Sequence, residues 1–431
     1  MNADTLKLVS LILFIATYVS LLAFPKFRAY VALGSAVLFT LIGAIPLEKV
    51  LPAINWNVIM MIAGTMGTVY LFIVSKMPAR MADAIIERMP NVKWTIIALS
   101  LFAGIISAFV DNVATVLMVA PIALDISKKL KISPVHSIIA IAIASNLQGA
   151  ATLVGDTTSI LLGGYAGMNF LDFFFFEGRI GMFWVVQLGA LASTLILVWL
   201  FRKDTQPIQV NERTQVEDYF PSYLLLGTVL ALIVASFLPG MPEMINGYIC
   251  VGFFLIGILR ELFLKNNKAV IVESLKEIDF FTLLLLSGLF VVIGSITEVG
   301  IVDDIGKLFL RISDNPFVIY TLLVWASVLL SAFIDNIPYI ATMLPVTQAI
   351  AVAMNIDPTV FYFGLLAGAT LGGNLTPIGA SANITGLGIL RKAGYEVKAS
   401  TFMKISIPFT LAAVVTGYVL IWLIWQSSLA V

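Results

Sequence analysis

Long apolar runs separated by short polar segments dominate this chain of 431 residues. A helix that crosses a bilayer needs about 20 mostly apolar residues. Runs of about that length recur at 6–24, 29–46, 56–75, 181–201, 222–238, 247–262, 280–297 and 404–425. The pattern predicts a polytopic membrane protein made of helices. The first run has no small-residue cleavage site after a short apolar core, so we interpret it as a retained helix rather than a signal peptide.

The two halves of the chain resemble each other at a constant offset along the sequence. Ser107-Ala-Phe-Val-Asp-Asn112 recurs as Ser331-Ala-Phe-Ile-Asp-Asn336. Prolines and glycines keep the same register, for example Pro121 with Pro345 and Gly155 with Gly379. A fixed period with matched glycine, proline and acidic positions indicates a duplicated structural unit.

Each half is predicted to contain three spanning helices, a helix-break-helix segment around the Asp-Asn pair, and two more spanning segments. The expected boundaries are a first repeat at 1–201 with a hairpin at 94–130 and a broken helix at 136–166, a cytoplasmic linker at 202–220, and a second repeat at 221–431 with a hairpin at 317–354 and a broken helix at 359–390. If each hairpin is re-entrant, each half crosses five times, and an odd number inverts the second copy. The fold class is therefore all-α, with two inverted repeats, about 10 transmembrane helices and two re-entrant hairpins.

The orientation follows from the tendency of short cytoplasmic loops to collect Lys and Arg. With the N-terminus outside, most of the 25 basic residues fall in cytoplasmic loops or at the cytoplasmic boundary. We therefore expect an inner-membrane protein with both termini outside the cytoplasm. Amphipathic stretches at 78–92 and 301–314 are either interfacial helices or arms that connect a mobile unit to a fixed one.

Composition narrows the function. Apolar residues make up 60% of the chain, charged residues 12%, and the formal net charge is zero, which gives no electrostatic basis for binding nucleic acid. The single cysteine, Cys250, lies in an apolar run and permits no intramolecular disulfide. We expect no cofactor other than sodium or protons as coupling ions, no enzymatic activity, and the lipid bilayer and a small ion or ion-coupled solute as partners.

Candidate binding residues gather where the predicted helices break. Irregular backbone inside the bilayer is tolerated only where protein buries it or where it lines a cavity, and half-helix ends then present carbonyls and amides to an ion. The first half offers Asp111, Asn112, Thr115, Thr152, Gly155, Asp156 and Ser159, and the second offers Asp335, Asn336, Asn374, Thr376, Gly379, Ser381 and Asn383. We expect two pseudosymmetric oxygen cages, one from Asn112, Thr115, Thr152 and Ser159, and its twin from Asn336, Thr376, Ser381 and Asn383.

Three acids lie inside the predicted spans, and an intramembrane carboxylate is a functional-site hypothesis because its burial is costly. Asp111 and Asp335 have a plainer alternative role as caps of the second hairpin helices. Asp156 has no acidic counterpart, because Ala380 stands at the equivalent position. That asymmetry argues against a purely architectural role for Asp156.

At these motifs the chain resembles the ion-transporter superfamily of the melanosomal P protein, the ArsB-type arsenite carriers, the NhaD-type sodium/proton antiporters and the dicarboxylate/sodium symporters. The likeness is carried by Ser331-Ala-Phe-Ile-Asp-Asn-Ile-Pro338, Ala341-Thr-Met343 and Gly372-Gly-Asn-Leu-Thr-Pro-Ile-Gly-Ala-Ser-Ala-Asn383. The resemblance implies a transport domain that moves like an elevator against a dimeric scaffold. It also implies substrate and sodium binding at Asn112, Thr152, Asn336, Thr376 and Asn383.

The substrate class follows from charge. Every basic residue falls in a predicted loop or at a membrane boundary, so the centre is expected to hold up to three carboxylates and no fixed cation. Such a field favours a cation. We predict a sodium/proton-type antiporter working by alternating access. The alternatives are sodium- or proton-coupled transport of an anion or oxyacid such as a dicarboxylate, citrate or arsenite, and, from other classes, a channel or an intramembrane aspartyl protease.

Overall fold

The computed structural model describes residues 2–130, 132–207 and 213–429. The chain is an all-α multi-pass membrane protein, and the strands among these described residues form one two-stranded antiparallel ribbon of β1 (Phe175–Phe176) and β2 (Arg179–Ile180). Part of the linker predicted at 202–220 lies outside the described residues, at 208–212.

Ten α-helices make up the described part of the first half. They are α1 (Ala3–Ala23), α2 (Arg28–Leu41), α3 (Leu47–Ala53), α4 (Trp56–Val74), α5 (Met77–Ile86), α6 (Val92–Ser107), α7 (Asn112–Lys129), α8 (Val135–Gln148), α9 (Thr157–Ala166) and α10 (Met182–Leu200). A short 3-10 turn, η2 (Gly149–Ala151), ends α8, and residues 152–156 are unwound before α9 begins.

The described part of the second half repeats this order. It contains α11 (Phe220–Ser236), α12 (Ile245–Phe263), α13 (Lys268–Lys276), α14 (Phe280–Glu298), α15 (Ile301–Leu310), α16 (Pro316–Ser331), α17 (Asn336–Met354), α18 (Thr359–Gly372), η4 (Gly373–Leu375), α19 (Ser381–Lys392) and α20 (Ala399–Trp425). The elements from α4 to η2 correspond one by one to the elements from α14 to η4. The first residues of each pair are separated by the same number of positions as Ser107 and Ser331, which is the repeat offset.

The helix starts repeat because the capping residues repeat. Side chains that accept a hydrogen bond from the first turn of a helix occur as Asn55 and Asp279, Asn91 and Asn315, and Asp111 and Asp335, and the members of each pair are separated by the repeat offset. Asn and Asp are favoured at these positions because the side-chain oxygen satisfies an amide that has no partner within the helix.

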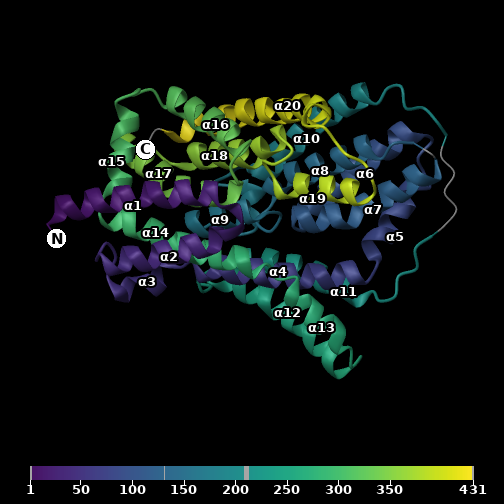
Figure 1. Cartoon of the computed structure of the whole chain (residues 1–431), viewed down its shortest axis with the longest axis horizontal. Helices are drawn as coiled ribbons and strands as arrows, with labels where there is room; N and C mark the ends of the chain where they lie inside the picture. Colours follow the sequence, from purple (N-terminus) through teal and green to yellow (C-terminus); the bar gives the residue numbers. More distant parts are fainter. Residues whose placement is uncertain (1, 131, 208–212, 430–431) are drawn as a thin grey trace.

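The helices form two layers that we call the scaffold layer (α1–α4 and α11–α14) and the hairpin layer (α6–α10 and α16–α20). In Figure 1 the scaffold helices α2, α3, α4, α12 and α13 lie in the lower part and α10, α16, α18 and α20 in the upper part. The amphipathic helices α5 and α15 connect the layers at opposite ends of the molecule.

The core of the hairpin layer surrounds α8 and α18. Every residue from Ser137 to Gln148 and from Thr359 to Gly372 is buried. A helix buried on all sides belongs to the interior of a bundle. The two broken helices therefore run through the middle of this layer, which brings their unwound segments to its centre.

The scaffold layer is built by crossed packing between the halves. Helix α4 packs on α12, and α14 packs on α2. A Cβ on Gly64 of α4 would lie 2.5 Å from the backbone N of Val251, and a Cβ on Gly288 of α14 would lie 2.7 Å from that of Leu33. These helices approach so closely that neither position has room for a side chain. The same contact buries Cys250 completely.

Among the described residues, 7 helical segments are long and apolar enough to span a bilayer. They are Ala3–Ala23, Leu47–Val74, Met182–Leu200, Ile245–Phe263, Lys268–Glu298, Asn336–Met354 and Ala399–Ser428. The segment Asn336–Met354 belongs to the stretch that the sequence predicts as a hairpin arm. The other expected crossings include α2, α11 and the two broken helices, whose individual helices are each shorter than any of these segments. A broken helix crosses as two short pieces, so length alone does not detect it.

The two termini lie at one end of the molecule and the chain between the halves lies at the other (Figure 1). Residues on either side of 208–212 bind the neighbouring elements. The amides of Val92 and Lys93 donate to the carbonyls of Gln206 and Asp204, and Arg213 pairs with Glu87 at 2.7 Å. Asp218 then pairs with Arg260 at 2.5 Å. The linker thus contacts both layers.

Candidate functional site

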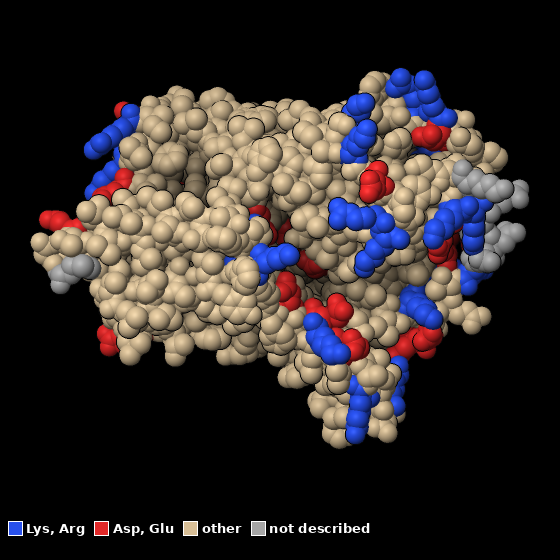
Figure 2. Space-filling view, in the orientation of Figure 1, with Lys and Arg blue, Asp and Glu red and all other residues tan. Residues whose placement is uncertain are grey.

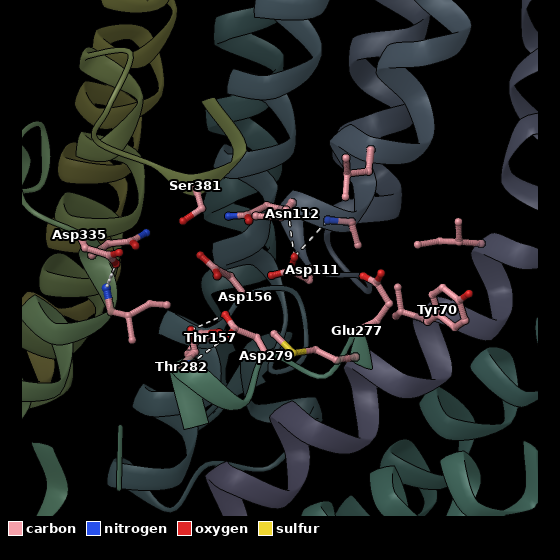
Figure 3. A pocket seen from close by; sticks show the side chains of 18 residues that line it. Tyr70, Asp111, Asn112, Asp156, Thr157, Glu277, Asp279, Thr282, Asp335 and Ser381 are labelled. Atoms are coloured by element: carbon pink, nitrogen blue, oxygen red, sulfur yellow. Dashed lines mark hydrogen bonds between the residues drawn. The ribbon is translucent and has the colours of Figure 1, made fainter. Parts of the chain in front are cut away.

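A cavity of about 300 Å³ lies between the two layers at the tips of both hairpins. Its polar lining residues are Tyr70, Asp111, Asn112, Asp156, Thr157, Glu277, Asp279, Thr282, Asp335, Asn336 and Ser381. Figure 2 shows charged side chains gathered toward the two ends of the molecule and, near its middle, acidic side chains in a hollow with a basic side chain beside it. Figure 3 shows this lining, with Asp111 and Asp156 near its centre and Asp335 on one side.

The hairpin tips place one acid and one amide each at the cavity. Asp111 caps α7, because its Oδ1 accepts from the backbone amides of Val113 at 2.9 Å and Ala114 at 3.2 Å. Asp335 caps α17 and accepts from the amide of Ile337 at 3.1 Å. Both acids therefore cap their hairpin helices, and both also face the cavity.

The unwound segments are fastened to the hairpin tips in the same way in each half. The hydroxyl of Thr152 donates to the carbonyl of Ala108, and that of Thr376 donates to the carbonyl of Ala332. Both threonines are buried. Each broken helix and the hairpin beside it are thus joined through a side chain that the sequence places at the break.

Gly155 and Gly379 sit where backbone carbonyls converge. A Cβ on Gly155 would lie 2.7 Å from the carbonyl oxygen of Gly149 and 2.9 Å from that of Ala108. At Gly379 the corresponding distances are 2.5 Å to Gly373 and 2.8 Å to Ala332. Only glycine fits, and its absent side chain lets the unwound segment approach the end of the hairpin helix.

Asp156 belongs to a buried polar chain that crosses between the repeats. Its carboxylate accepts from Thr158 at 3.1 Å, and the Thr158 hydroxyl lies 3.0 Å from that of Thr370. Asn146 donates to the carbonyl of Thr370 at 2.8 Å and accepts from Asn112 at 3.0 Å. Asp156 is only 5% exposed, so its side chain is held by the protein rather than by bulk water.

Several buried side-chain oxygens have no hydrogen-bond partner within the part of the chain that the structure describes. They are Thr115 Oγ1, Asn374 Oδ1 and Asn383 Oδ1 among the predicted site residues. The amide nitrogens of both asparagines are used, since Asn374 donates to the carbonyl of Ile143 and Asn383 to those of Gly373 and Thr376. Their side-chain carbonyl oxygens therefore keep free lone pairs. Neutral oxygens of this kind are ligands for hard cations such as sodium.

The structure brings some predicted residues to the cavity and buries others nearby. The residues that line it are Asp111, Asn112, Asp156, Asp335, Asn336 and Ser381. Gly155 lines a small adjoining pocket with Asp111 and Asp156. The remaining residues, Thr115, Thr152, Ser159, Asn374, Thr376, Gly379 and Asn383, do not line the main cavity and lie in the surrounding elements.

The two hairpin tips line one common cavity. One expectation needs correction, because a fixed cation lies beside this cavity. Arg28, expected at the cytoplasmic boundary, pairs with Asp335 through an Nη1 to Oδ2 contact of 2.9 Å. Its long side chain extends from the first residue of α2 to the tip of the second hairpin.

Sequence reasoning missed five polar lining residues, Tyr70, Thr157, Glu277, Asp279 and Thr282. Thr157 begins α9 in the hairpin layer, whereas the other four come from α4, the end of α13 and the start of α14 in the scaffold layer. Asp279 caps α14 at the position equivalent to Asn55, so the repeat register carries a signal for it. No comparable signal distinguishes Glu277, whose position at the cavity depends on how the layers meet.

Comparisons with known proteins agree with a transporter. Residues 11–368 match the family described as citrate transporter. An uncharacterized transporter of Mycobacterium tuberculosis is 29% identical over 97% of this chain and 99% of its own length. A 46 kDa membrane protein of Mycobacterium leprae is 32% identical over 74% of each chain. The human P protein is 26% identical over 75% of this chain and 48% of its own length.

Solved structures share the fold. The YdaH transporter of Alcanivorax borkumensis aligns with a TM-score of 0.58 over 88% of this chain and 87% of its own, at 14% identity. MtrF of Neisseria gonorrhoeae, described among antimetabolite efflux pumps, aligns with a TM-score of 0.55 over 99% of this chain and 95% of its own, at 15% identity. At these identities the likeness concerns the fold alone.

Proposed function

This chain belongs to the citrate transporter family, and we propose that it is a secondary active transporter that exchanges a monovalent cation, sodium in the first instance, for protons. The observation that carries the proposal is the charge of the central cavity. Among the described residues, its lining includes the carboxylates of Asp111, Asp156, Glu277, Asp279 and Asp335 and no lysine or arginine. Arg28 compensates one of these carboxylates from outside the lining.

Such a cavity attracts cations and repels anions. At an effective dielectric constant near 20, two unit charges 4 Å apart interact by about 4 kcal/mol. A carboxylate that is largely withdrawn from water, such as Asp156, is stabilised either by a proton or by a bound cation. Competition between the two for one carboxylate is the simplest chemical basis for exchange.

The buried oxygens around the cavity support a sodium site. Within the described ranges, the acceptors Asn383 Oδ1 and Asn374 Oδ1 have no hydrogen-bond partner, and neither does Thr115 Oγ1. Sodium bound by such neutral oxygens would enter and leave by small changes in the unwound segments. We place the exchanging acids at Asp111 and Asp156 and the neutral oxygens in the elements behind them.

Alternating access would come from sliding of the hairpin layer against the scaffold layer. The lining of the central cavity includes α4 and α14 from one layer and both hairpin tips from the other. A second cavity of about 400 Å³ also lies between the layers and is lined by Lys49, Tyr165 and Glu298 among others. An elevator-type movement would open one cavity as it closes the other. A homodimer joined through scaffold helices, with both termini outside the cytoplasm, remains our prediction.

A citrate-like anion is the second candidate substrate. The description of the matching family favours it, and Arg28 supplies a guanidinium that could bind a carboxylate. In the acidic cavity, such an anion would need accompanying cations. The distinction is therefore whether an organic anion is required for turnover.

Proteoliposomes containing the purified protein test the proposal. We expect an imposed sodium gradient to collapse a pH gradient without any organic anion, as followed with an internal pH-sensitive dye. A strict requirement for citrate or another carboxylate would overturn cation exchange and favour the second candidate.

Variants that replace a carboxylate identify the residues at which a cation is exchanged for a proton. Asp156→Asn and Asp111→Asn should each lower sodium-dependent proton movement by at least about tenfold, because each loses the group that exchanges its proton. Asp125→Asn is the matched control, since Asp125 is an exposed acid of the same hairpin. Full activity in Asp156→Asn would remove that residue from the mechanism.

A further inference from the structure

One ion pair joins the scaffold layer to the tip of the second hairpin. Arg28 Nη1 lies 2.9 Å from Asp335 Oδ2, and the side chains are 17% and 24% exposed. The Nε of Arg28 donates to the carbonyl of Leu21 at 3.1 Å, which holds the guanidinium in place from the end of α1. The pair is therefore partly withdrawn from water and built from both layers.

The twin acid of the first hairpin is bound differently. Asp111 accepts only amide hydrogen bonds from the start of α7, and Asp156 accepts from Thr158. Among the described residues, neither forms an ion pair with a lysine or arginine. A fixed positive charge thus pairs with Asp335 but, across the residues that the structure describes, with neither of the other two acids predicted from the sequence.

The duplicated unit does not need this cation for its architecture. Gly288 packs on Ala32 and Leu33, and Gly64 packs on Cys250 and Val251, so Ala32 corresponds to Cys250. Four residues before these positions stand Arg28 and Asn246. The second half therefore has a neutral asparagine where the first half has arginine. A charge present in one copy alone points to a role in transport.

We propose that Arg28 is an internal counter-ion that occupies Asp335 and so excludes the transported cation from this acid. Of the three acids predicted from the sequence, Asp111 and Asp156 are then left to bind the cation, and Arg28 sets how many positive charges the cavity takes. This inference rests on the proposed cation exchange and assigns a residue that determines its specificity.

The proposal predicts effects of opposite sign for the two partners. Arg28→Gln leaves the Asp335 carboxylate free, so the cavity gains an unpaired negative charge and binds sodium more tightly. Asp335→Asn leaves the guanidinium unpaired beside the cavity, so sodium binds more weakly. By Coulomb's law over several ångströms, each change in the dissociation constant should be about tenfold. The double variant, Arg28→Gln with Asp335→Asn, lacks both charges. Its affinity for sodium should return close to that of the unaltered protein.

Thermal unfolding of the purified full-length protein in detergent, titrated with sodium chloride, measures this binding, because a ligand that binds the folded state raises the melting temperature. Choline chloride keeps the ionic strength constant, so that general screening does not contribute. Arg28→Lys keeps the charge and should behave like the unaltered protein. Arg213→Gln removes an exposed basic residue that pairs with Glu87 away from the cavity lining, and it controls for net charge.

The outcomes separate the inference from the proposed function. Opposite shifts with mutual rescue in the double variant support the inference. If the unaltered protein responds to sodium but both single variants shift the same way, or neither shifts, Arg28 has only a structural role and the inference is wrong. If the unaltered protein does not respond to sodium at all, cation exchange and this inference are both overturned.

Discussion

Single residues at the breaks are under tight steric limits, as Gly155 shows. We expect Gly155→Ala to lower the free energy of unfolding by about 1–3 kcal/mol, because its Cβ would push against the carbonyl oxygens of Gly149 and Ala108. It should also weaken the sodium response, since the unwound segment would move away from the hairpin tip. The control is Gly388→Ala in α19, where a Cβ meets nothing within 4 Å. Equal free energies of unfolding for Gly155→Ala and Gly388→Ala would show that the carbonyl groups of Gly149 and Ala108 move aside without cost.

The ion pairs of Asp218, a residue outside the membrane-spanning segments, predict how the stability of the protein depends on pH. Partial burial opposes its ionisation, but hydrogen bonds from Arg260 and Lys265 outweigh that effect and lower the pKa of Asp218 from 3.8 to about 2. A pKa lower in the folded than in the unfolded state gives stability that is present above about pH 4. That contribution is lost as the pH falls toward 2.

Thermal unfolding at several pH values checks this assignment. Asp218→Asn should lower stability by about 1–3 kcal/mol near pH 7, since it removes a charged acceptor from two basic residues. The difference between this variant and the unaltered protein should shrink as the pH approaches 2. A stability difference between Asp218→Asn and the unaltered protein that stays constant with pH would contradict the lowered pKa of Asp218.

At the residue scale the sequence predicts the acids better than their partners. Asp111, Asp156 and Asp335 stand out because a carboxylate in an apolar span is conspicuous. Arg28 is predicted at the boundary because it follows the first apolar run, whereas in the structure its side chain reaches Asp335. Hydroxyls such as that of Thr152 are predicted to bind an ion, but Thr152 donates to the carbonyl of Ala108. Which atom a side chain bonds depends on how elements that are distant in sequence pack.

Helix contacts make the clearest prediction at the scale of elements. Gly64→Ala and Gly288→Ala should each lower the melting temperature and the yield of folded protein, because the new Cβ would overlap the backbone of α12 or α2. The expected cost is about 1–3 kcal/mol each. Membrane helices approach closely only where small residues line the contact.

The same helices offer matched controls. A Cβ on Gly252 of α12 or Gly34 of α2 meets nothing within 4 Å. Alanine there should be neutral or stabilise the helix by about 0.5–1 kcal/mol. Similar losses at all four glycines would mean that flexibility, rather than close packing, is what these positions supply.

Elements are more predictable than their number of crossings. The register of the repeat locates the hairpins and breaks because glycine, proline and capping residues are local signals. Apolar length is a weaker guide. The arm Asn336–Met354 is as long as a spanning helix, whereas α8 and α18 are shorter and still form the centre of the hairpin layer. Burial by neighbouring helices, which no single segment encodes, decides these cases.

For the whole molecule, the proposed sliding of layers can be tested by joining them. Tyr165 of the hairpin layer and Thr297 of the scaffold layer line the same 400 Å³ cavity. With cysteines at both positions, a short disulfide-forming bifunctional reagent should stop transport, and a reducing agent should restore it. Cysteines at Lys49 and Thr297, both in the scaffold layer, are the matched control and should leave transport unchanged after the same treatment. Unimpaired transport with Tyr165 joined to Thr297 would contradict sliding.

The close contact that buries Cys250 has a practical consequence. Its side chain is wholly inaccessible between α12 and α4, so water-soluble thiol reagents should not react with the natural protein. A cysteine introduced at a loop or cavity would then be the sole target for a fluorophore or spin label, without first replacing the native one. Distances between labels on the two layers could therefore be followed during turnover in a background that keeps every natural helix contact intact.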